Sequence, residues 1–206
     1  LKYPEIFKTQ IKAILRASYN GNVKIMFPMV TKAEEIDEIK KIIQKAKYEL
    51  KEKKVNFDDN IPVGVMIETP SAALTCDVII KKVDFVSLGT NDLIQYTLAV
   101  DRFNENVADL FDPFHPSVLK LIKHVVDIAH SKNKTVSICG GMAADTMFTK
   151  ILIGLGIDEL SVPPSLVLKI KKIICETNFY DSKELAEEVL KAEDSKTIID
   201  ILKQEK

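Results

Sequence analysis

Short apolar runs alternate with amphipathic stretches along most of this 206-residue sequence. The apolar runs have the length and composition of buried strands, and they cover residues 23–30, 63–67, 83–88, 135–139 and 157–162. Each run is followed by a stretch with apolar residues at helical spacing. Five strands, each followed by a helix, predict parallel strands joined by right-handed crossovers.

The helical stretches carry start and stop signals. Thr31 is a candidate N-cap for a long helix, and Thr69-Pro70 offers a cap and a first-turn proline for another. The pattern predicts helices over residues 4–20, 31–54, 69–81, 116–131, 145–155 and 164–177, with a short helix after residue 92 and two charged amphipathic helices within 182–202.

Two parallel architectures fit this pattern. A barrel of eight strand–helix units takes about 250 residues, whereas a doubly wound sheet of five strands fits the observed length more comfortably. The run 63–67, Val-Gly-Val-Met-Ile, is wholly apolar, as in parallel strands that are buried on both faces. The sequence has no internal repeat and no low-complexity linker. We therefore expect a single α/β domain over 1–206, with 181–206 as a peripheral helical tail.

Charge and composition exclude several classes of function. The net charge of −1 argues against a general binder of nucleic acid or of anionic membranes. The sequence has no apolar run of membrane-spanning length and no signal-peptide pattern. Three widely spaced cysteines, Cys76, Cys139 and Cys175, do not form a disulfide framework, so we expect a cytoplasmic protein. The chain begins at Leu1 without an initiator methionine, which favours a piece of a longer protein.

Polar residues follow the predicted strands at the edge where parallel α/β proteins place their sites. Glu68 comes directly after 63–67, and Asp92 follows 83–88. Two carboxylates on neighbouring strand ends can share Mg²⁺, with substrate phosphate and water completing the coordination. The alternative is that both carboxylates cap the following helices or pair with lysines.

Three further residues at this edge are candidates for binding or catalysis. Asn91 can hydrogen-bond substrate oxygen or cap its own helix. Arg102 is one of only two arginines among 29 basic residues, and arginine is favoured where a phosphate or carboxylate is bound bidentately. The other arginine, Arg16, lies on a predicted helix and is interpreted as structural. Cys139 precedes Gly140-Gly141 and is either a site thiol or a small buried residue.

Together these residues resemble a known family. Similar segments occur in the carboxyl-terminal, phosphoenolpyruvate-binding barrel of enzyme I of the bacterial phosphotransferase system, the phosphoenolpyruvate–protein phosphotransferases. The motifs that carry the resemblance are Ile67-Glu68-Thr69-Pro70-Ser71-Ala72, Gly89-Thr90-Asn91-Asp92-Leu93, residues 95–102 (Gln-Tyr-Thr-Leu-Ala-Val-Asp-Arg) and Ile138-Cys139-Gly140. This resemblance implies an incomplete (β/α)8 TIM barrel, of which the chain holds about five of eight strand–helix units.

The resemblance also implies roles for individual residues. Glu68 and Asp92 would bind Mg²⁺. Asn91, Asp92 and Arg102 would bind the substrate, phosphoenolpyruvate. Cys139 would be the acid that protonates the enolpyruvate carbon after the phosphoryl group leaves. One departure from the family lies beside it, because relatives usually carry glutamate where this chain has Gly141.

The family further implies partners that this chain does not hold. Enzyme I passes the phosphoryl group to a histidine of its own amino-terminal domain and then to the histidine phosphocarrier protein for sugar uptake, and its barrel forms the homodimer. The acceptor histidine and further phosphate-binding arginines are absent here, so we expect no turnover from this piece alone. Alternative interpretations are a fragment of a pyruvate phosphate dikinase or phosphoenolpyruvate synthase, and a non-catalytic dimerisation module.

Overall fold

A computed structural model describes residues 3–204, which form one five-stranded parallel sheet with helices between the strands. Hydrogen-bonded neighbours follow sequence order, β1-β2-β3-β4-β5. The strands are β1 (Ile25–Phe27), β2 (Val63–Ile67), β3 (Phe85–Gly89), β4 (Thr135–Cys139) and β5 (Glu159–Leu160).

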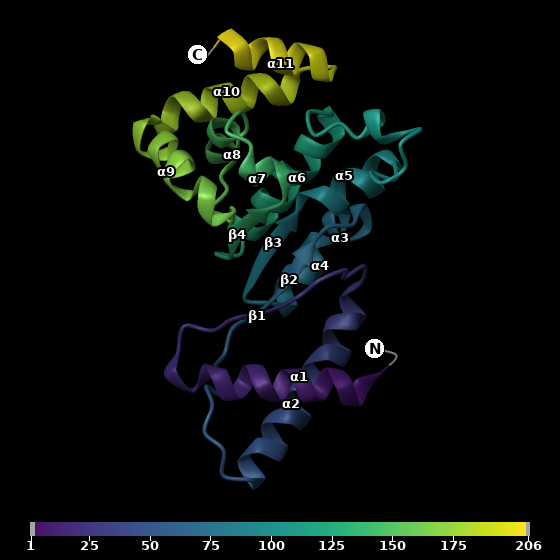
Figure 1. Ribbon diagram of the computed structural model, residues 1–206, viewed down its shortest axis with the longest axis vertical. Helices are drawn as coiled ribbons and strands as arrows, with labels where there is room; N and C mark the ends of the chain where they lie inside the picture. Colours follow the sequence, from purple (N-terminus) through teal and green to yellow (C-terminus); the bar gives the residue numbers. More distant parts are fainter. Residues whose placement is uncertain (1–2, 205–206) are drawn as a thin grey trace.

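Helices lie at both ends of the molecule and behind the sheet (Figure 1). Helices α1 and α2 lie together at one end, and α8 to α11 lie at the other. The α-helices are α1 (Pro4–Ala17), α2 (Ala33–Glu52), α3 (Pro70–Leu74), α4 (Cys76–Ile79), α5 (Thr90–Leu98), α6 (Pro116–His130), α7 (Gly141–Ala144), α8 (Thr149–Leu155), α9 (Val167–Glu176), α10 (Phe179–Lys191) and α11 (Ser195–Gln204). None of the helices between residues 3 and 204 is long and apolar enough to cross a membrane.

The strand order separates the two architectures that the sequence left open. A doubly wound sheet reverses its strand order part-way and carries helices on both faces. Here every strand pairs in parallel with the next along the chain, without a reversal. This is the winding of a TIM barrel, in which all crossovers lie on the outside. The parallel α/β fold is confirmed, and the incomplete barrel fits it.

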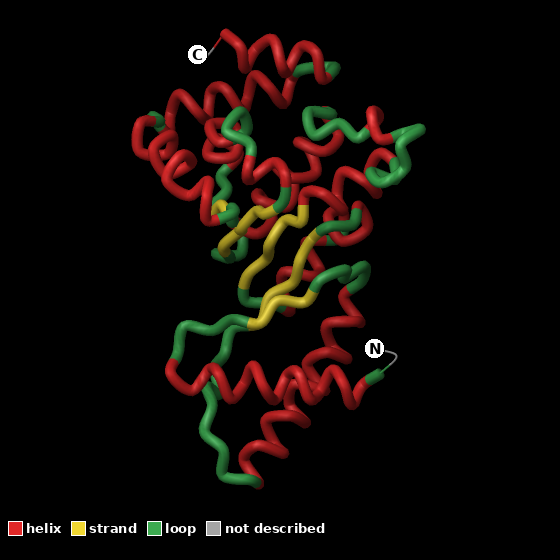
Figure 2. The backbone as a smooth tube through the Cα atoms, in the orientation of Figure 1, coloured by secondary structure: helices red, strands yellow, loops and turns green. Residues whose placement is uncertain are grey.

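The two faces of the sheet have different environments. Val65, Val86 and Val136 lie side by side in register and are completely buried under the helices. On the opposite face, Met66 is partly exposed and lies beside Ser87, which in turn lies beside Ser137. This open face lines a concavity of about 440 Å³, and Figure 2 shows its strands unobscured by any helix. The prediction that residues 63–67 are buried on both faces holds for every residue of β2 except Met66.

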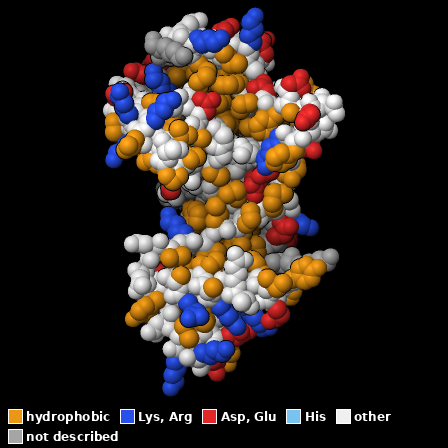
Figure 3. Space-filling view, in the orientation of Figure 1, with side chains coloured by type: hydrophobic (Ala, Val, Ile, Leu, Met, Phe, Trp, Pro, Cys, Tyr) orange, Lys and Arg blue, Asp and Glu red, His pale blue; other side chains and the backbone are white. Residues whose placement is uncertain are grey.

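Hydrophobic side chains gather over the middle of the molecule, between its two helical ends, in the space-filling view (Figure 3). Met26 of β1 belongs to the open face and is 40% exposed. Lys24 lies at the same edge, with its ammonium 5.2 Å from the ring centre of Phe85. The surface that would be the interior of a closed barrel is thus part of the outer surface here.

Two predicted strands are shorter than expected. Only Ile25–Phe27 of the run 23–30 pairs with β2, because Pro28 follows and Met29 adopts a positive φ of 54°. The last strand is reduced to Glu159–Leu160. Both lie at the edges of the sheet, where a strand has one partner and apolar sequence alone does not set its length.

Several helix boundaries also differ from prediction. The stretch 69–81 is divided at Thr75, whose hydroxyl donates to the carbonyl oxygen of Ser71 instead of leaving the helix regular. The stretch 145–155 forms α8 only from Thr149, after the separate short α7. Helix α2 begins at Ala33, and its orphan N–H groups near Thr31 are satisfied by the Glu35 carboxylate.

Helices α8 and α10 pack unusually closely. A Cβ atom at Gly154 of α8 would lie 1.8 Å from the carbonyl oxygen of Ser182 in α10. Leu185, Ala186 and Val189 of α10 are buried in the common core. The backbone contact at Gly154 therefore fixes how close α10 lies to the rest of the fold.

Candidate phosphoenolpyruvate-binding site

Glu68 lies at the carboxyl end of β2 and is almost completely buried, with 3% of its surface exposed. Its Oε1 atom accepts a 2.6 Å hydrogen bond from the backbone N–H of Met29, which follows β1. Burial raises the pKa of this carboxyl group, and the neighbouring Asp92 carboxylate raises it further. A buried carboxylate with one hydrogen bond and a like charge beside it needs a compensating positive charge.

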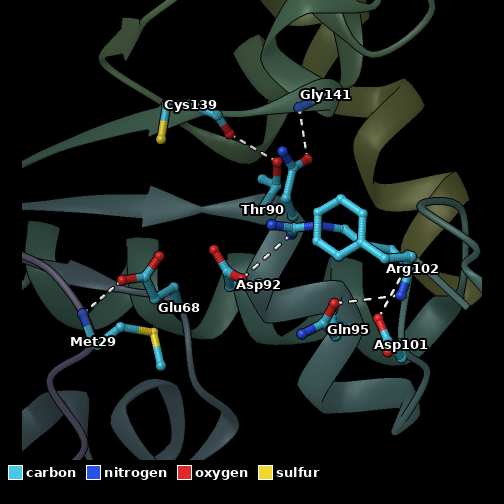
Figure 4. A network of polar contacts seen from close by, with 11 residues as sticks. Met29, Glu68, Thr90, Asp92, Gln95, Asp101, Arg102, Cys139 and Gly141 are labelled. Atoms are coloured by element: carbon cyan, nitrogen blue, oxygen red, sulfur yellow. Dashed lines mark hydrogen bonds and ion pairs between the residues drawn. The ribbon is translucent and has the colours of Figure 1, made fainter.

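Asp92 lies in the first turn of α5, directly after β3. Figure 4 shows its carboxylate between Glu68 and Arg102. The Asp92 Oδ1 atom is 3.3 Å from Nη1 of Arg102, so one cation already faces the carboxylate pair. The structure thus brings Glu68 and Asp92 together as predicted. No group of three or more His, Cys, Asp or Glu side chains suited to a metal occurs within the described residues.

Arg102 lies in the loop after α5, where Gln95 contacts its backbone and the ring of Phe103 lies beside its side chain. The Arg102 backbone N–H donates to Oε1 of Gln95, 3.4 Å away. The guanidinium carbon is 5.0 Å from the ring centre of Phe103. Nη1 is buried, yet it makes no hydrogen bond of good geometry with any of the described residues. Its contact with Asp92 is thus an ion pair without a well-directed hydrogen bond.

Cys139 is the last residue of β4, and its side chain is partly exposed on the open face of the sheet. Its Sγ atom is 3.5 Å from the carbonyl oxygen of Leu88. Burial raises the pKa of the thiol, against a hydrogen bond from Ser87 that lowers it, and the negative charges of Glu68 and Asp92 raise it further. The environment therefore keeps the thiol protonated at neutral pH.

Asn91 lies at the start of α5, close to the turn that follows β4. Its Oδ1 atom accepts a 2.9 Å hydrogen bond from the backbone N–H of Gly141. All the residues that the sequence singled out therefore gather at the carboxyl ends of β2, β3 and β4. Arg16 does not join them, because it lies exposed on α1.

Sequence reasoning missed two contributors. The backbone N–H of Met29 holds Glu68, and no side-chain pattern signals a backbone donor. Thr90 is completely buried, and its hydroxyl donates to the carbonyl oxygen of Cys139 over 2.8 Å. A threonine directly after a predicted strand end was the available signal for Thr90, but it is equally typical of a helix cap.

Comparison with known proteins decides the family. Residues 1–179 match the family described as PEP-utilising enzyme, PEP-binding domain. This chain belongs to that family. It is 48% identical over 198 residues to a protein of Buchnera aphidicola (subsp. Schizaphis graminum) named phosphoenolpyruvate-protein phosphotransferase, covering 96% of the chain and 35% of the relative. A protein of the same name from Haemophilus influenzae is 50% identical, over 90% of the chain and 32% of the relative. The chain thus spans about a third of these relatives.

Solved structures agree on the fold. A citrate lyase from Burkholderia xenovorans superimposes with a TM-score of 0.61 at 17% identity, covering 96% of this chain and 67% of the lyase. An HpcH/HpaI aldolase/citrate lyase family protein from Burkholderia cenocepacia superimposes with a TM-score of 0.55 at 15% identity, covering 84% of this chain and 68% of that one. These are TIM-barrel proteins, so the predicted incomplete barrel is confirmed.

Proposed function

We propose that this PEP-binding domain binds phosphoenolpyruvate at the carboxyl ends of β2, β3 and β4, as part of a phosphoenolpyruvate–protein phosphotransferase. One observation carries the proposal. Arg102 has a buried Nη1 atom without a hydrogen bond among the described residues, 3.3 Å from Asp92. A buried guanidinium nitrogen that makes an ion pair but no well-directed hydrogen bond can turn an N–H group towards the oxygen of an anionic ligand, and arginine suits phosphate or carboxylate geometry.

The residues present also fit Mg²⁺. Glu68 and Asp92 put two carboxylates side by side, and the charge of Asp92 raises the pKa of Glu68 in addition to the effect of burial. Oxygen ligands of this kind suit Mg²⁺, which usually keeps one or two protein carboxylates and takes the rest of its ligands from phosphate and water. When bound, the ion would neutralise charge on the phosphate oxygens. The chain's own contribution is to hold both carboxylates in place, Glu68 through Met29 and Asp92 through Arg102.

Cys139 is the proposed proton donor. When the bond between phosphorus and the enol oxygen breaks, the phosphoryl group leaves for a nucleophile and the enolate of pyruvate remains. Protonation of the terminal carbon of this enolate gives pyruvate and leaves Cys139 as the thiolate, which must be reprotonated. A thiol with a raised pKa carries its proton at neutral pH, as a carbon acid requires.

The remaining steps belong to parts that this chain does not contain. The proposed acceptor is a histidine of an amino-terminal domain, which passes the phosphoryl group to the histidine phosphocarrier protein in the cytoplasm. The supporting observation is the shared name of the relatives, each about three times as long as this chain. A dikinase or synthase remains the alternative parent for the same site.

A dimerisation role is a second candidate function, and one observation favours it. Helices cover one face of the sheet only, while the other exposes Met26 and Met66 around a concavity of about 440 Å³. Open strand edges and an open sheet face favour association with another surface. Under this interpretation the chain would form a homodimer and bind no phosphoenolpyruvate.

Calorimetry separates the two functions. Phosphoenolpyruvate is titrated into the 206-residue chain with and without Mg²⁺, and the same titration is repeated with Arg102→Ala. Binding that needs both Mg²⁺ and Arg102 supports the phosphoenolpyruvate site. Absence of heat in the wild type, together with a dimer in light scattering, would establish the interaction module instead.

A further inference from the structure

The side-chain amide of Asn91 has a fixed orientation in this structure. Its Oδ1 atom lies 2.9 Å from the backbone nitrogen of Gly141. A backbone N–H can only donate, so the amide oxygen must face Gly141 and the NH₂ group must point elsewhere. The NH₂ group of Asn91 is therefore the part of the amide left for another partner, and a hydrogen-bond donor suits the oxygen of an anion.

The turn that supplies this N–H depends on Gly140. Its φ of +91° is a conformation that glycine adopts without strain. A Cβ atom at Gly140 would also lie 2.5 Å from Oγ1 of Thr90. The first turn of α5 therefore approaches the backbone after β4 so closely that no side chain fits between them.

Thr90 and Asn91 hold two successive peptide groups of that turn. The Thr90 hydroxyl donates to the carbonyl oxygen of Cys139 over 2.8 Å, and Asn91 accepts from Gly141. Figure 4 shows both hydrogen bonds, with the Cys139 thiol on the opposite side of its residue from the carbonyl. Thr90 is completely buried, so it cannot itself touch a ligand.

We propose that Thr90 is a positioning residue, which clamps the Cys139–Gly141 turn onto α5 and thereby sets the Asn91 donor and the Cys139 thiol as one unit. The inference deepens the proposed function and rests on it for the identity of the ligand. The clamp itself does not depend on that identity, because it consists of contacts within the chain. Two readouts therefore test the two ideas separately.

The first readout is the reactivity of Cys139 towards iodoacetamide at a single pH, followed by mass spectrometry. Exposed Cys175 is replaced by serine in every variant, and Cys76 is buried. Thr90→Val keeps the side-chain shape and removes the donor, so we expect the alkylation rate of Cys139 to change by about threefold or more. Thr90→Ser restores the hydroxyl and is expected to react at the wild-type rate. Equal rates for all three proteins would overturn the clamp.

The second readout is the dissociation constant of phosphoenolpyruvate with Mg²⁺. Thr90→Val is expected to weaken binding about tenfold, and Thr90→Ser to restore it. Asn91→Asp still accepts from Gly141 but cannot donate and adds a negative charge, so it should lose ligand affinity while the Gly141 amide stays protected from hydrogen exchange. If Asn91→Asp binds as well as the wild type, the assigned donor is wrong. If the wild type does not bind, the proposed function fails while the alkylation result still decides the clamp.

Amide hydrogen exchange in the wild type keeps the inference testable even if Thr90→Val does not fold. The Gly141 residue is exposed, but its N–H group is hydrogen-bonded to Asn91. We expect this amide to exchange at least about tenfold more slowly than an unprotected one. Exchange at the unprotected rate would show that the turn is not held, and would contradict the proposal.

Discussion

The buried carboxylate of Glu68 accepts a 2.6 Å hydrogen bond from the backbone N–H of Met29, and this contact joins the segments that follow β1 and β2. The contact orients Glu68 but does not neutralise it. Asp92 adds a second negative charge, and the positive charge of Arg102 opposes the rise in the Glu68 pKa only in part. The fold thus places an ionisable group at a position where its ionisation is costly, as functional sites often do.

Glu68→Gln is therefore expected to stabilise the ligand-free chain. Because the folded-state pKa of Glu68 is raised, its favourable contribution is complete below the unfolded value of 4.5 and is lost as the pH rises through the folded value. At neutral pH the variant should melt about 2–4 °C above the wild type, as expected for roughly 1 kcal/mol in a chain of this size. Thermal melts at pH 7 and pH 4 measure this.

The same variant should lose any stabilisation by Mg²⁺. The control is Glu187→Gln, which removes an exposed carboxylate from α10 and should leave both the melting temperature and the Mg²⁺ response unchanged. A Glu68→Gln variant less stable than the wild type at pH 7 would show that the carboxylate is already compensated within the chain.

Arg102→Lys tests whether geometry or charge matters at the anion site. Lysine keeps the positive charge but lacks the planar fork that can bind two oxygens at once. We expect the affinity for phosphoenolpyruvate with Mg²⁺ to fall about tenfold or more. Arg16→Lys, at the exposed arginine of α1, is the matched control and should bind as the wild type does. Equal affinities for both variants would assign Arg102 a purely electrostatic role.

Acid unfolding should depend on Glu49 of α2. This carboxylate pairs with Lys8 at 2.9 Å and with Lys12, and the hydrogen bonds from these lysines lower its pKa from 4.5 to about 2. A lowered folded-state pKa stabilises the protein above the unfolded value, and that contribution is lost as the pH falls from 4.5 towards 2.

Glu49→Gln should therefore flatten the dependence of the melting temperature on pH between 4.5 and 2. The effect is expected to shrink in high salt, because Glu49 is accessible to solvent ions. Glu52→Gln, one turn further along α2 and exposed, provides the comparison. Identical pH profiles for Glu49→Gln and the wild type would mean that the lysines contribute no net stability.

Gly154→Ala should loosen α10 from α8. The added methyl group would overlap the carbonyl oxygen of Ser182, which can move only if the helices separate. We expect a loss of about 1–3 kcal/mol in urea unfolding, the usual cost of overpacking a close contact. Ser182→Ala is the control. It removes a buried hydroxyl for which the described residues provide no hydrogen-bond partner, so it should be neutral or stabilising.

The sequence predicted the alternation of strands and helices along the chain. It did not predict features that depend on a single backbone contact. Strand β2 coincides with the predicted run 63–67, because a fully paired strand follows its apolar sequence. The run 23–30 predicted β1 but not its length, because the positive φ at Met29 ends the pairing and turns its N–H towards Glu68. The same distinction applies to the residues of the candidate site. Glu68, Asp92 and Arg102 were found from residue type and position, whereas Thr90 acts on a peptide carbonyl that no residue type identifies.

The different environments of the two sheet faces have a consequence for how this protein can change. In β3, Val86 and Leu88 support the helices, whereas Ser87 faces the concavity. Successive residues of a strand therefore have different roles: one contributes to the folded core and the next faces the candidate site. In a saturation mutagenesis library over β3 and β4, the effects should alternate with a period of two residues. Substitutions at one set of positions should lower the amount of folded protein, and those at the other set should change ligand affinity. Such a chain can acquire a new ligand by altering alternate residues while its folded core stays intact.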